Sequence, residues 1–438
     1  MLLLKKIITA VVVYIFTSQV HAALTIDITQ GVEGALPIAI VPFVWEGNQD
    51  LPEDVTAVIR ADLQRSGRFA PVADEDLVDR PTVGSKVNFQ TWRVLNVDNL
   101  VVGKIVLLKD GNYQVQFQLF DIYKAIQLAG YSIKSSKKGL RRTAHRISDI
   151  IYEKLMGVKG AFDTQIAYVT VIKKGEAKTK LYKLAVADSD GHNERIIYSS
   201  IQPVLSPSWS PDGRFIAYVA YARGRPELYI QNVYTRRTKR LTSYQGLNNA
   251  PAWSPNGKNL AVTLSKDGNP EIYILDVETS KLTRITRNYA IDTEPAWFPD
   301  GKGLVFTSDR GGGPQIYQVD LGRRGASGKV KRLSYEGSYN ARASISPDGK
   351  KVAMVHRVDD AFHIGVLDLK TEHMTVLTES NLDESPSFAP NGSMIIYATE
   401  YDNKGVLSAV SVDGRARQRL SFQKGDVREP AWSPFKTR

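Results

Sequence analysis

The sequence predicts a multidomain α/β and all-β protein, in which a small N-terminal α/β domain precedes a six-bladed β-propeller closed by the C-terminal strand. Three observations lead to this fold class. The second part of the chain carries a repeat of nearly constant length, and that repeat begins and ends out of phase. The residues before it combine strand and helix patterns without any repeat.

The repeat is an apolar residue followed by a Ser-Pro-Asp-Gly element or a close variant of it. The intervals between successive inner prolines are 44, 44, 48, 43 and 44 residues. A repeat of roughly 40–45 residues built from short strands and turns is typical of a β-propeller. The Pro and Gly positions suit a type I turn between the first two strands of each blade. The six prolines are Pro211, Pro255, Pro299, Pro347, Pro390 and Pro434.

The phase of the repeat predicts how the ring closes. Residues 162–200 supply patterns for only three strands, and the last copy, around Trp432, supplies a single strand. We therefore expect the C-terminal strand to complete the first blade. Such closure removes the unpaired edges that an open ring would expose.

Residues 24–160 alternate between strand and helix patterns. Tyr113, Val115, Phe117 and Leu119 alternate with three glutamines, which predicts a sheet buried on one face only. A helix over 140–155 carries apolar residues at helical spacing and is expected to cover that face, the alternative being a helix on a membrane surface. The expected elements are strands at 37–43, 100–108, 113–120 and 126–133, and helices at 53–65 and 140–155.

The N-terminus has the pattern of a secretory signal peptide. Lys5 and Lys6 precede an apolar run over 7–16, and a small-residue cleavage site ends at Ala22. Cleavage there removes two lysines and no acid, which lowers the formal net charge from +11 to +9. We expect a signal peptide at 1–22, an α/β domain at 23–160 with a tail at 23–34, and a propeller at 161–438. No later segment is apolar enough to be expected to span a membrane.

The densest basic cluster of the chain lies between Lys134 and Arg146. It lacks the interleaved aromatic residues on which nucleic-acid bases stack. The solvated face of a helix start is therefore the favoured interpretation, ahead of a nucleic-acid patch, and we expect no nucleic-acid partner.

The sequence offers no catalytic constellation. It contains no Gly-x-Ser-x-Gly element and no His-x-x-x-His pair. The segment from Asp188 to Gly191 departs from the spacing of a calcium loop and is interpreted as a turn of the first blade. We expect no enzyme activity, no cofactor and no metal site. Three classes stay open, in this order: a binding adaptor, a glycan- or cell-wall-binding exported propeller, and an exported hydrolase.

One residue per blade lies just before the strand that lines the central channel. Positions of a repeat that only pack should be alike, whereas these differ in charge and size and converge on one channel mouth. Partner binding is therefore slightly favoured over ordinary loop variation. The six positions are Ser206, Ala250, Glu294, Arg342, Ser385 and Glu429.

The chain resembles the TolB family, the periplasmic components of the Tol-Pal system of Gram-negative bacteria. The resemblance covers the whole chain. It includes segments outside the repeat, among them 37–43, 61–67, 154–162, 293–300 and 382–386. It implies a periplasmic monomer that docks the outer-membrane lipoprotein Pal at the channel mouth, supports outer-membrane integrity and constriction during cell division, and is exploited by colicins. Other outer-membrane proteins are further expected partners.

The resemblance also implies which residues contact Pal. Thr293 and Glu294 match the family residue by residue, whereas family members carry a His at the position of Leu247. The expected Pal-binding residues are Ser206, Leu247, Asn249, Ala250, Thr293, Glu294, Arg342, Ser385 and Glu429.

The tail at 23–34 has a strand-like alternation of apolar and polar residues that ends at glycines. Such a segment is suited to add a strand to the sheet edge of a partner, or to form the first strand of its own domain. The resemblance implies that it binds the inner-membrane protein TolA. The tail residues concerned are Ala23, Leu24, Thr25, Ile26, Asp27, Ile28 and Thr29.

Overall fold

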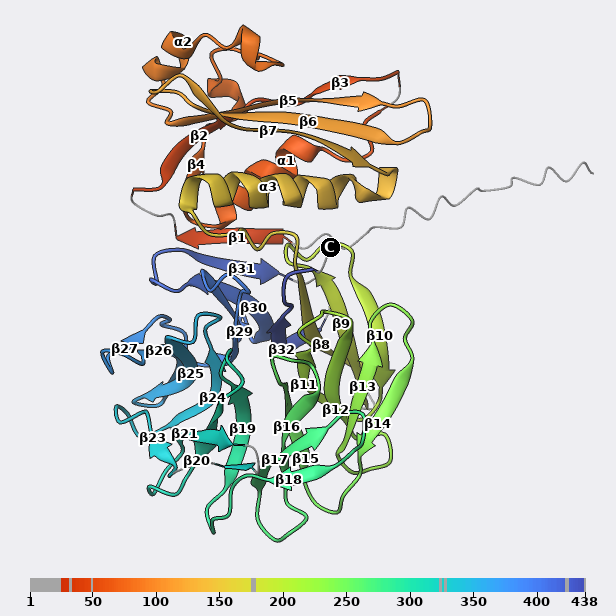
Figure 1. Cartoon of the computed structure of the whole chain (residues 1–438), viewed down its shortest axis with the longest axis vertical. Coiled ribbons are helices and arrows are strands. Elements are labelled where there is room, and N and C mark those ends of the chain that lie inside the picture. The colour runs from red at the N-terminus through yellow and green to blue at the C-terminus, as the bar shows by residue number, and fades with distance from the viewer. Residues whose placement is uncertain are drawn as a thin grey trace, which may run out of the picture.

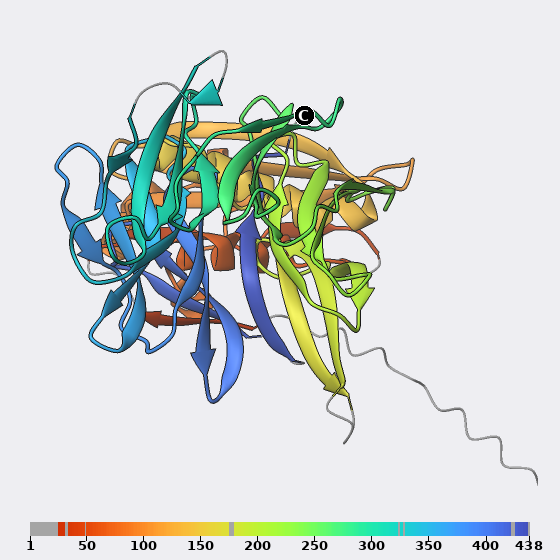
Figure 2. The same cartoon turned by 90° about the horizontal axis from the view of Figure 1, so that it is seen from below.

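The computed structural model describes residues 25–30, 34–48, 50–174, 179–322, 325–326, 329–421 and 425–436. The predicted signal peptide at 1–22, and with it Ala23 and Leu24, lies outside the described residues. An α/β part and a propeller pack against each other (Figure 1), and Figure 2 shows the propeller in front of the α/β part. No helix within the described ranges has the length and apolar character needed to cross a bilayer.

The propeller consists of six antiparallel sheets, and we letter the strands of each blade A to D from the channel outward. Blade 1 comprises β32 (Asp426–Trp432), β8 (Gln165–Lys174), β9 (Thr179–Asp188) and β10 (Arg195–Ser200). Blade 2 comprises β11 (Val204–Trp209), β12 (Phe215–Ala220), β13 (Glu227–Asn232) and β14 (Thr238–Thr242). Blade 3 comprises β15 (Asn248–Trp253), β16 (Asn259–Leu264), β17 (Glu271–Asp276) and β18 (Leu282–Arg284).

The other three blades follow the same order. Blade 4 comprises β19 (Asp292–Trp297), β20 (Gly303–Ser308), β21 (Gln315–Gly322), β22 (Gly325–Ala326) and β23 (Lys331–Arg332). Blade 5 comprises β24 (Asn340–Ile345), β25 (Lys351–Val358), β26 (Ala361–Asp368) and β27 (Met374–Val376). Blade 6 comprises β28 (Glu384–Phe388), β29 (Met394–Tyr401), β30 (Lys404–Ser411) and β31 (Arg417–Ser421).

The ring closes as the repeat phase predicts. β32 pairs antiparallel with β8, with Val427 opposite Thr170 and Trp432 opposite Ile166. The C-terminal strand is thus the innermost strand of the first blade. This confirms a six-bladed propeller closed by its own C-terminus.

Successive blades are locked together by the residues of the repeat. The indole Nε1 of Trp209 donates to the carbonyl of Ala431 at 3.0 Å, and Trp253 and Trp297 make the same bond to the preceding blade. The turn glycines take positive φ, and a Cβ on Gly257 would lie 3.4 Å from Pro211 of the preceding turn. The repeat therefore encodes the contacts between blades as well as the turns within them.

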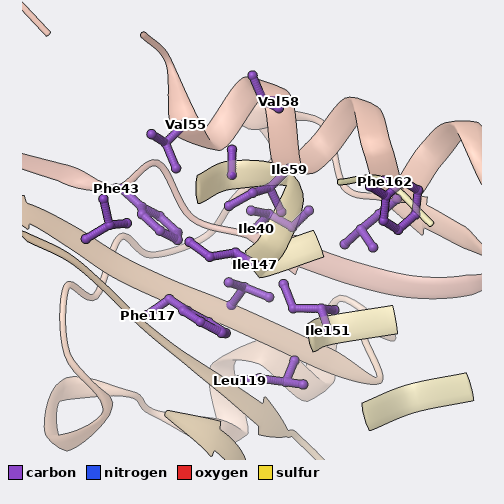
Figure 3. Packing of buried hydrophobic residues seen from close by; sticks show 14 of the residues in the cluster. Ile40, Phe43, Val55, Val58, Ile59, Phe117, Leu119, Ile147, Ile151 and Phe162 are labelled. Atoms are coloured by element: carbon purple, nitrogen blue, oxygen red, sulfur yellow. The ribbon is translucent and has the colours of Figure 1, made fainter. Parts of the chain in front are cut away.

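The α/β part is a mixed sheet of order β4-β2-β5-β6-β7, with β3 also paired to β5. Its helices α1 and α3 cover one face, where Ile59, Ile147 and Ile151 meet Phe117 and Leu119 (Figure 3). All five side chains are almost fully buried. This confirms core packing for the helix expected at 140–155, which is α3, and shows that the membrane-surface alternative was wrong. The strands are β2 (Leu36–Ile40), β3 (Val44–Glu46), β4 (Phe69–Pro71), β5 (Asn99–Leu107), β6 (Tyr113–Asp121) and β7 (Ile126–Ser135). The helices are α1 (Val55–Arg65), α2 (Phe89–Val94) and α3 (Leu140–Met156), with short 3₁₀ turns at Asp74–Asp76, Gly84–Lys86 and Lys137–Gly139.

The opposite face of this sheet corrects one expectation. The polar residues of β6 lie half-buried there, but a second core forms over β2 and β5, where Ala39, Leu100 and Val102 are fully buried. Trp92 of the short helix α2 covers them and is itself fully buried. The sheet is therefore buried on both faces at β2 and β5, because α2 provides a cover that the sequence pattern did not reveal.

The tail strand β1 (Thr25–Gln30) belongs to the propeller and not to the α/β sheet. It pairs antiparallel with β31, with Ile26 opposite Leu420 and Ile28 opposite Gln418, and so becomes the fifth strand of blade 6. The interpretation of the tail as the first strand of its own domain was wrong. The described part of the tail instead extends a sheet edge of the same chain, between α3 and β31 in Figure 1.

The interface between the two parts is strongly ionic. Arg141 of α3 lies 2.5 Å from Asp190 in the C–D turn of blade 1 and 2.9 Å from Glu53. His145 lies beside it, with Nδ1 2.8 Å from Asp62 and Nε2 3.3 Å from Asp190. The expectation that the basic cluster is a solvated helix face was therefore wrong for Arg141.

His145 is almost fully buried, and its surroundings shift its pKa. Desolvation alone would lower the pKa of its imidazole, but the carboxylates of Asp62 and Asp190 outweigh it and raise the pKa to about 10. Desolvation likewise opposes ionisation of Asp190, yet its cationic neighbours hold the pKa of that carboxyl well below its usual range. Both groups are thus charged at neutral pH and hold the two parts together.

Candidate partner-binding site at the channel mouth

The strand order places all six predicted positions at one end of the channel. The A strands begin at the end where the D–A and B–C connections lie, and they finish at the A–B turns. Each predicted position lies near the start of an A strand, where neighbouring A strands approach one another around the axis. We call Ser206, Ala250, Glu294, Arg342, Ser385 and Glu429 the ring residues.

Every ring residue has a left-handed backbone. Their φ values run from 48° at Ala250 to 57° at Ser385, although none of the six is glycine. In each blade a register shift falls at the same place, so that a β-bulge interrupts the A–B pairing six times. A bulge re-aims side chains and ends regular pairing.

Such backbone conformations are costly for residues with a Cβ, on the order of 1 kcal/mol or more each. They persist only where the surrounding fold imposes them, and they cluster at binding and catalytic sites. A sixfold repetition around one channel mouth therefore marks this ring as the strongest site candidate of the propeller.

Arg342 is the electrostatic centre of the ring. Its Nε lies 3.1 Å from Glu294, its NH2 donates to Glu429 at 2.8 Å, and its NH1 donates to Ser385 at 2.5 Å. One guanidinium thus links blades 4, 5, 6 and 1. The backbone N–H of Arg342 and the hydroxyl of Thr307 both donate to Glu294 at 3.0 Å, which fixes that carboxylate.

The charges of this cluster are set by burial and by their neighbours. Burial would lower the pKa of Arg342, but Glu429 and Glu294 hold it above its usual range. Burial raises the pKa of Glu384, the residue before the ring member Ser385, against the opposing effect of Arg342. The mouth therefore combines one half-buried cation with several carboxylates around it.

Four of the other predicted residues lie in the A strands of blades 2, 3 and 4. The hydroxyl of Ser206 donates to the side-chain oxygen of Asn249 at 3.4 Å, and the backbone N–H of Ala250 donates to the same oxygen at 2.8 Å. Thr293 shares a 3.4 Å hydrogen bond with Thr263. Leu247 is not part of this network: its side chain is 39% exposed in the D–A connection above.

Sequence reasoning missed an apolar rim around the mouth. The D–A connections carry large side chains that are strongly exposed, up to 90% for Tyr289. Exposed apolar groups gathered on one face are typical of protein-interaction surfaces. The sequence signal that could have revealed this rim is the recurrence of large apolar residues in the D–A connections of different blades. Within the described connections they are Ile201, Tyr244, Leu247, Tyr289, Ile291, Tyr335 and Leu382.

Comparison with known proteins agrees with this architecture. A family model described as the TolB amino-terminal domain matches residues 24–128, and one described as the TolB beta propeller domain matches residues 152–436. The chain belongs to the TolB family. Its relatives include the Tol-Pal system protein TolB of Nitrosococcus oceani, 56% identical over 97% of this chain and 97% of that protein. The protein of the same name from Thioalkalivibrio sulfidiphilus is 57% identical over 95% of this chain and 94% of its own length.

A solved structure supports the same assignment. The crystal structure of TolB from Acinetobacter baumannii matches with a TM-score of 0.86 and 40% sequence identity, over 94% of this chain and 100% of that one. The expected resemblance and fold class are therefore confirmed. As a TolB family member the chain belongs to the Tol-Pal system, whose other components are its expected partners.

Proposed function

We propose that this protein is a periplasmic adaptor of the Tol-Pal system, which links the outer-membrane lipoprotein Pal to the inner-membrane protein TolA. In this role it supports outer-membrane integrity and constriction during cell division. Export through the signal peptide at 1–22, and the domain boundary after residue 160, belong to the same proposal. The observation that carries it is the ring of six bulged residues beneath an apolar rim.

The channel mouth has the properties of a protein-docking surface. Its centre holds a fixed charge cluster around Arg342, and its rim holds exposed aromatic and aliphatic side chains. Polar specificity surrounded by apolar area is how protein interfaces combine selectivity with affinity. We assign Pal to this mouth, with Glu294 as a central contact.

The tail is assigned to TolA because its described strand already pairs with a sheet edge. β1 forms a fifth strand on blade 6 through antiparallel backbone pairing. The same backbone groups serve equally well for addition to the sheet edge of a partner. The adaptor function uses two separate elements and requires no catalysis, so we propose that the protein is not an enzyme.

The mouth assignment is tested by reversing one charge. Glu294→Arg removes a partner of Arg342 and places a second cation at the ring, so Pal binding should fall by at least about tenfold. The melting temperature should fall as well, because the substitution removes the acceptor of the Arg342 N–H and the Thr307 hydroxyl, so affinity is compared at a temperature at which both proteins are folded. Titration calorimetry with purified Pal measures the affinity of the parent and variant proteins.

Lys329→Glu provides the matched control for this experiment. Lys329 is exposed in the C–D connection of blade 4, at the opposite end of the propeller. It should leave Pal binding within about twofold of the parent protein. Equal losses in the two variants would contradict the mouth assignment, and binding of cell-wall glycan in place of Pal would favour the glycan-binding alternative.

A further inference from the structure

A second groove lies at the seam between the two parts of the molecule, on the side away from the channel mouth. One wall is the end of β7 and the turn from Ser135 to Gly139, and the floor is one side of α3. The other wall consists of Lys159 and the C-terminal residues Phe435 and Lys436. We call this the α3 groove, and it shares no lining residue with the channel mouth.

Positive charge prevails along the α3 groove. Its five cations are Lys134, Arg142, Arg146, Lys159 and Lys436, and its three carboxylates are Asp149, Glu153 and Asp163. The carboxylates are mostly engaged already. Asp163 accepts from Arg142 at 3.1 Å and from Lys436 at 2.6 Å, while Asp149 accepts the backbone N–H groups of Phe162 and Asp163.

Several cations keep donors to spare. Arg146 is exposed and has no ion-pair partner anywhere in the described ranges. Arg142 is 56% exposed and engages Asp163 only through its Nε, which leaves the remaining guanidinium donors open to a ligand. Lys159 lies 3.9 Å above the ring of Phe435, which holds its ammonium at the groove wall.

The spacing of the arginines favours a particular shape of ligand. Arg142 and Arg146 are four residues apart on α3, a separation of about 6 Å along the helix axis. In an extended peptide, side chains on the same face recur every two residues, about 7 Å apart. Carboxylates at alternate peptide positions therefore match the two guanidinium groups, which bind carboxylates bidentately.

We propose that the α3 groove binds an extended acidic peptide segment of a protein partner, with carboxylates at alternate positions that pair with Arg142 and Arg146. The segment contacts α3, the linker at Lys159 and the end of the propeller, so it bridges the two parts of the chain. Because the groove and the channel mouth are separate, both are open to occupation at once. This site is additional to the adaptor function proposed above.

The shape and lining of the groove favour a peptide over other anions. Ile150 in the floor and Phe435 in the wall give it apolar surface that suits the intervening side chains of a peptide. Glu153 at its far end limits the length of negative charge that the groove accepts, which disfavours a long phosphate backbone more than a short peptide. A concave seam between two domains also does not match the flat surface of a bilayer.

The test uses the mature chain and a fluorescently labelled nine-residue peptide of alternating Glu and Ser. At low salt the peptide should bind, and binding should weaken as salt screens the ion pairs. Arg146→Glu should reduce its affinity by at least about tenfold, because it replaces an unpaired cation with a repelling charge. The melting temperature of this variant should match that of the parent, since the side chain is exposed.

Lys86→Glu is the matched control. Lys86 is an exposed cation of the same domain, but it lies in the 3₁₀ turn on the opposite face of the sheet from α3. Peptide affinity should stay within about twofold of the parent value. Equal weakening by the two variants, or no binding by the parent protein, would overturn the proposal.

Two further probes distinguish the chemistry of the ligand. A peptide of the same composition with its glutamates in one block should bind more weakly than the alternating peptide. Equal affinities would refute the proposed match between peptide and helix spacing. Sedimentation with vesicles of anionic phospholipid should be unaffected by Arg146→Glu, and a loss confined to vesicle binding would assign the groove to a membrane instead.

Discussion

At the scale of single residues, the tryptophans of the repeat both pack between blades and hydrogen-bond one blade to the next. The tryptophans of the A strands bury their rings between blades and donate their Nε1 to the preceding blade. Trp209 is 8% exposed, whereas Trp253 is only half-buried. Equivalent positions of the repeat therefore do not contribute equally to stability.

Trp209→Ala should lower the free energy of unfolding by about 3–5 kcal/mol, since it leaves a large cavity and an unpaired carbonyl at Ala431. Trp253→Ala should cost less, because more of its ring already faces solvent. Urea denaturation of the two variants measures both values. A smaller loss at Trp209 than at Trp253 would contradict this ranking.

His145 predicts a pH dependence of stability. Its pKa is raised from 6.5 to about 10 in the folded protein, so the stabilisation is fully present below pH 6.5 and is lost as the pH rises through 10. The free energy of unfolding should therefore fall between pH 7 and pH 10. His145→Gln removes the titrating group, and its stability should change less over that range. Denaturation curves at several pH values test this, and equal slopes for the two proteins would exclude His145 as the cause.

At the scale of elements, strands recognised by the repeat were located correctly and isolated short elements were not. β12 and β16 begin just after the repeat turns at Pro211 and Pro255, as the repeat predicts. β3 and β4 have three residues each, and α2 has six, too few for any periodic pattern.

The candidate site divides in the same way. The phase of the repeat was enough to select the six ring positions. Their left-handed backbone and the links from Arg342 to Glu294 and Glu429 could not be predicted, because they depend on how blades far apart in the sequence meet. The pairing of β1 with β31 was equally hidden, since nearly four hundred residues separate the two strands.

The closing strand gives the prediction at this scale. Deletion of residues 428–438 removes most of β32, which exposes the inner edge of β8 and takes Trp432 from between blades 6 and 1. The truncated protein should aggregate or unfold at a clearly lower temperature, because an unpaired inner edge is open to non-native pairing. Circular dichroism and light scattering during heating measure this. An unchanged, fully cooperative melt would contradict the role given to β32.

At the scale of the whole molecule, the two ends of the propeller have different roles. Among the described residues, no hydrogen bond or ion pair joins the ring residues to the α/β part, whose ion pairs reach Asp190 of blade 1 and Asp413 of blade 6 in their C–D turns. β1 pairs with the outer strand of blade 6 and leads from there to the α/β part. A tail in this position is docked on the body, and a tail paired with TolA would have to leave it.

This competition connects the tail to the proposed docking site at the mouth. Pal shifts the balance between docked and released tails only if it binds one of the two states more tightly. The coupling is reciprocal, so a partner that favours the released tail must bind more tightly once the tail is gone. Removal of residues 23–34 should therefore preserve the fold, abolish TolA binding and leave Pal binding equal or stronger.

Calorimetry with TolA and with Pal, on the full-length mature and truncated proteins, measures both effects. The melting temperature provides the control for folding, because β1 is an added edge strand and blade 6 keeps its four other strands without it. Retained TolA binding after truncation would refute the assignment of the tail. Weaker Pal binding by the truncated protein would instead show that Pal favours the docked state, with β1 in place on β31.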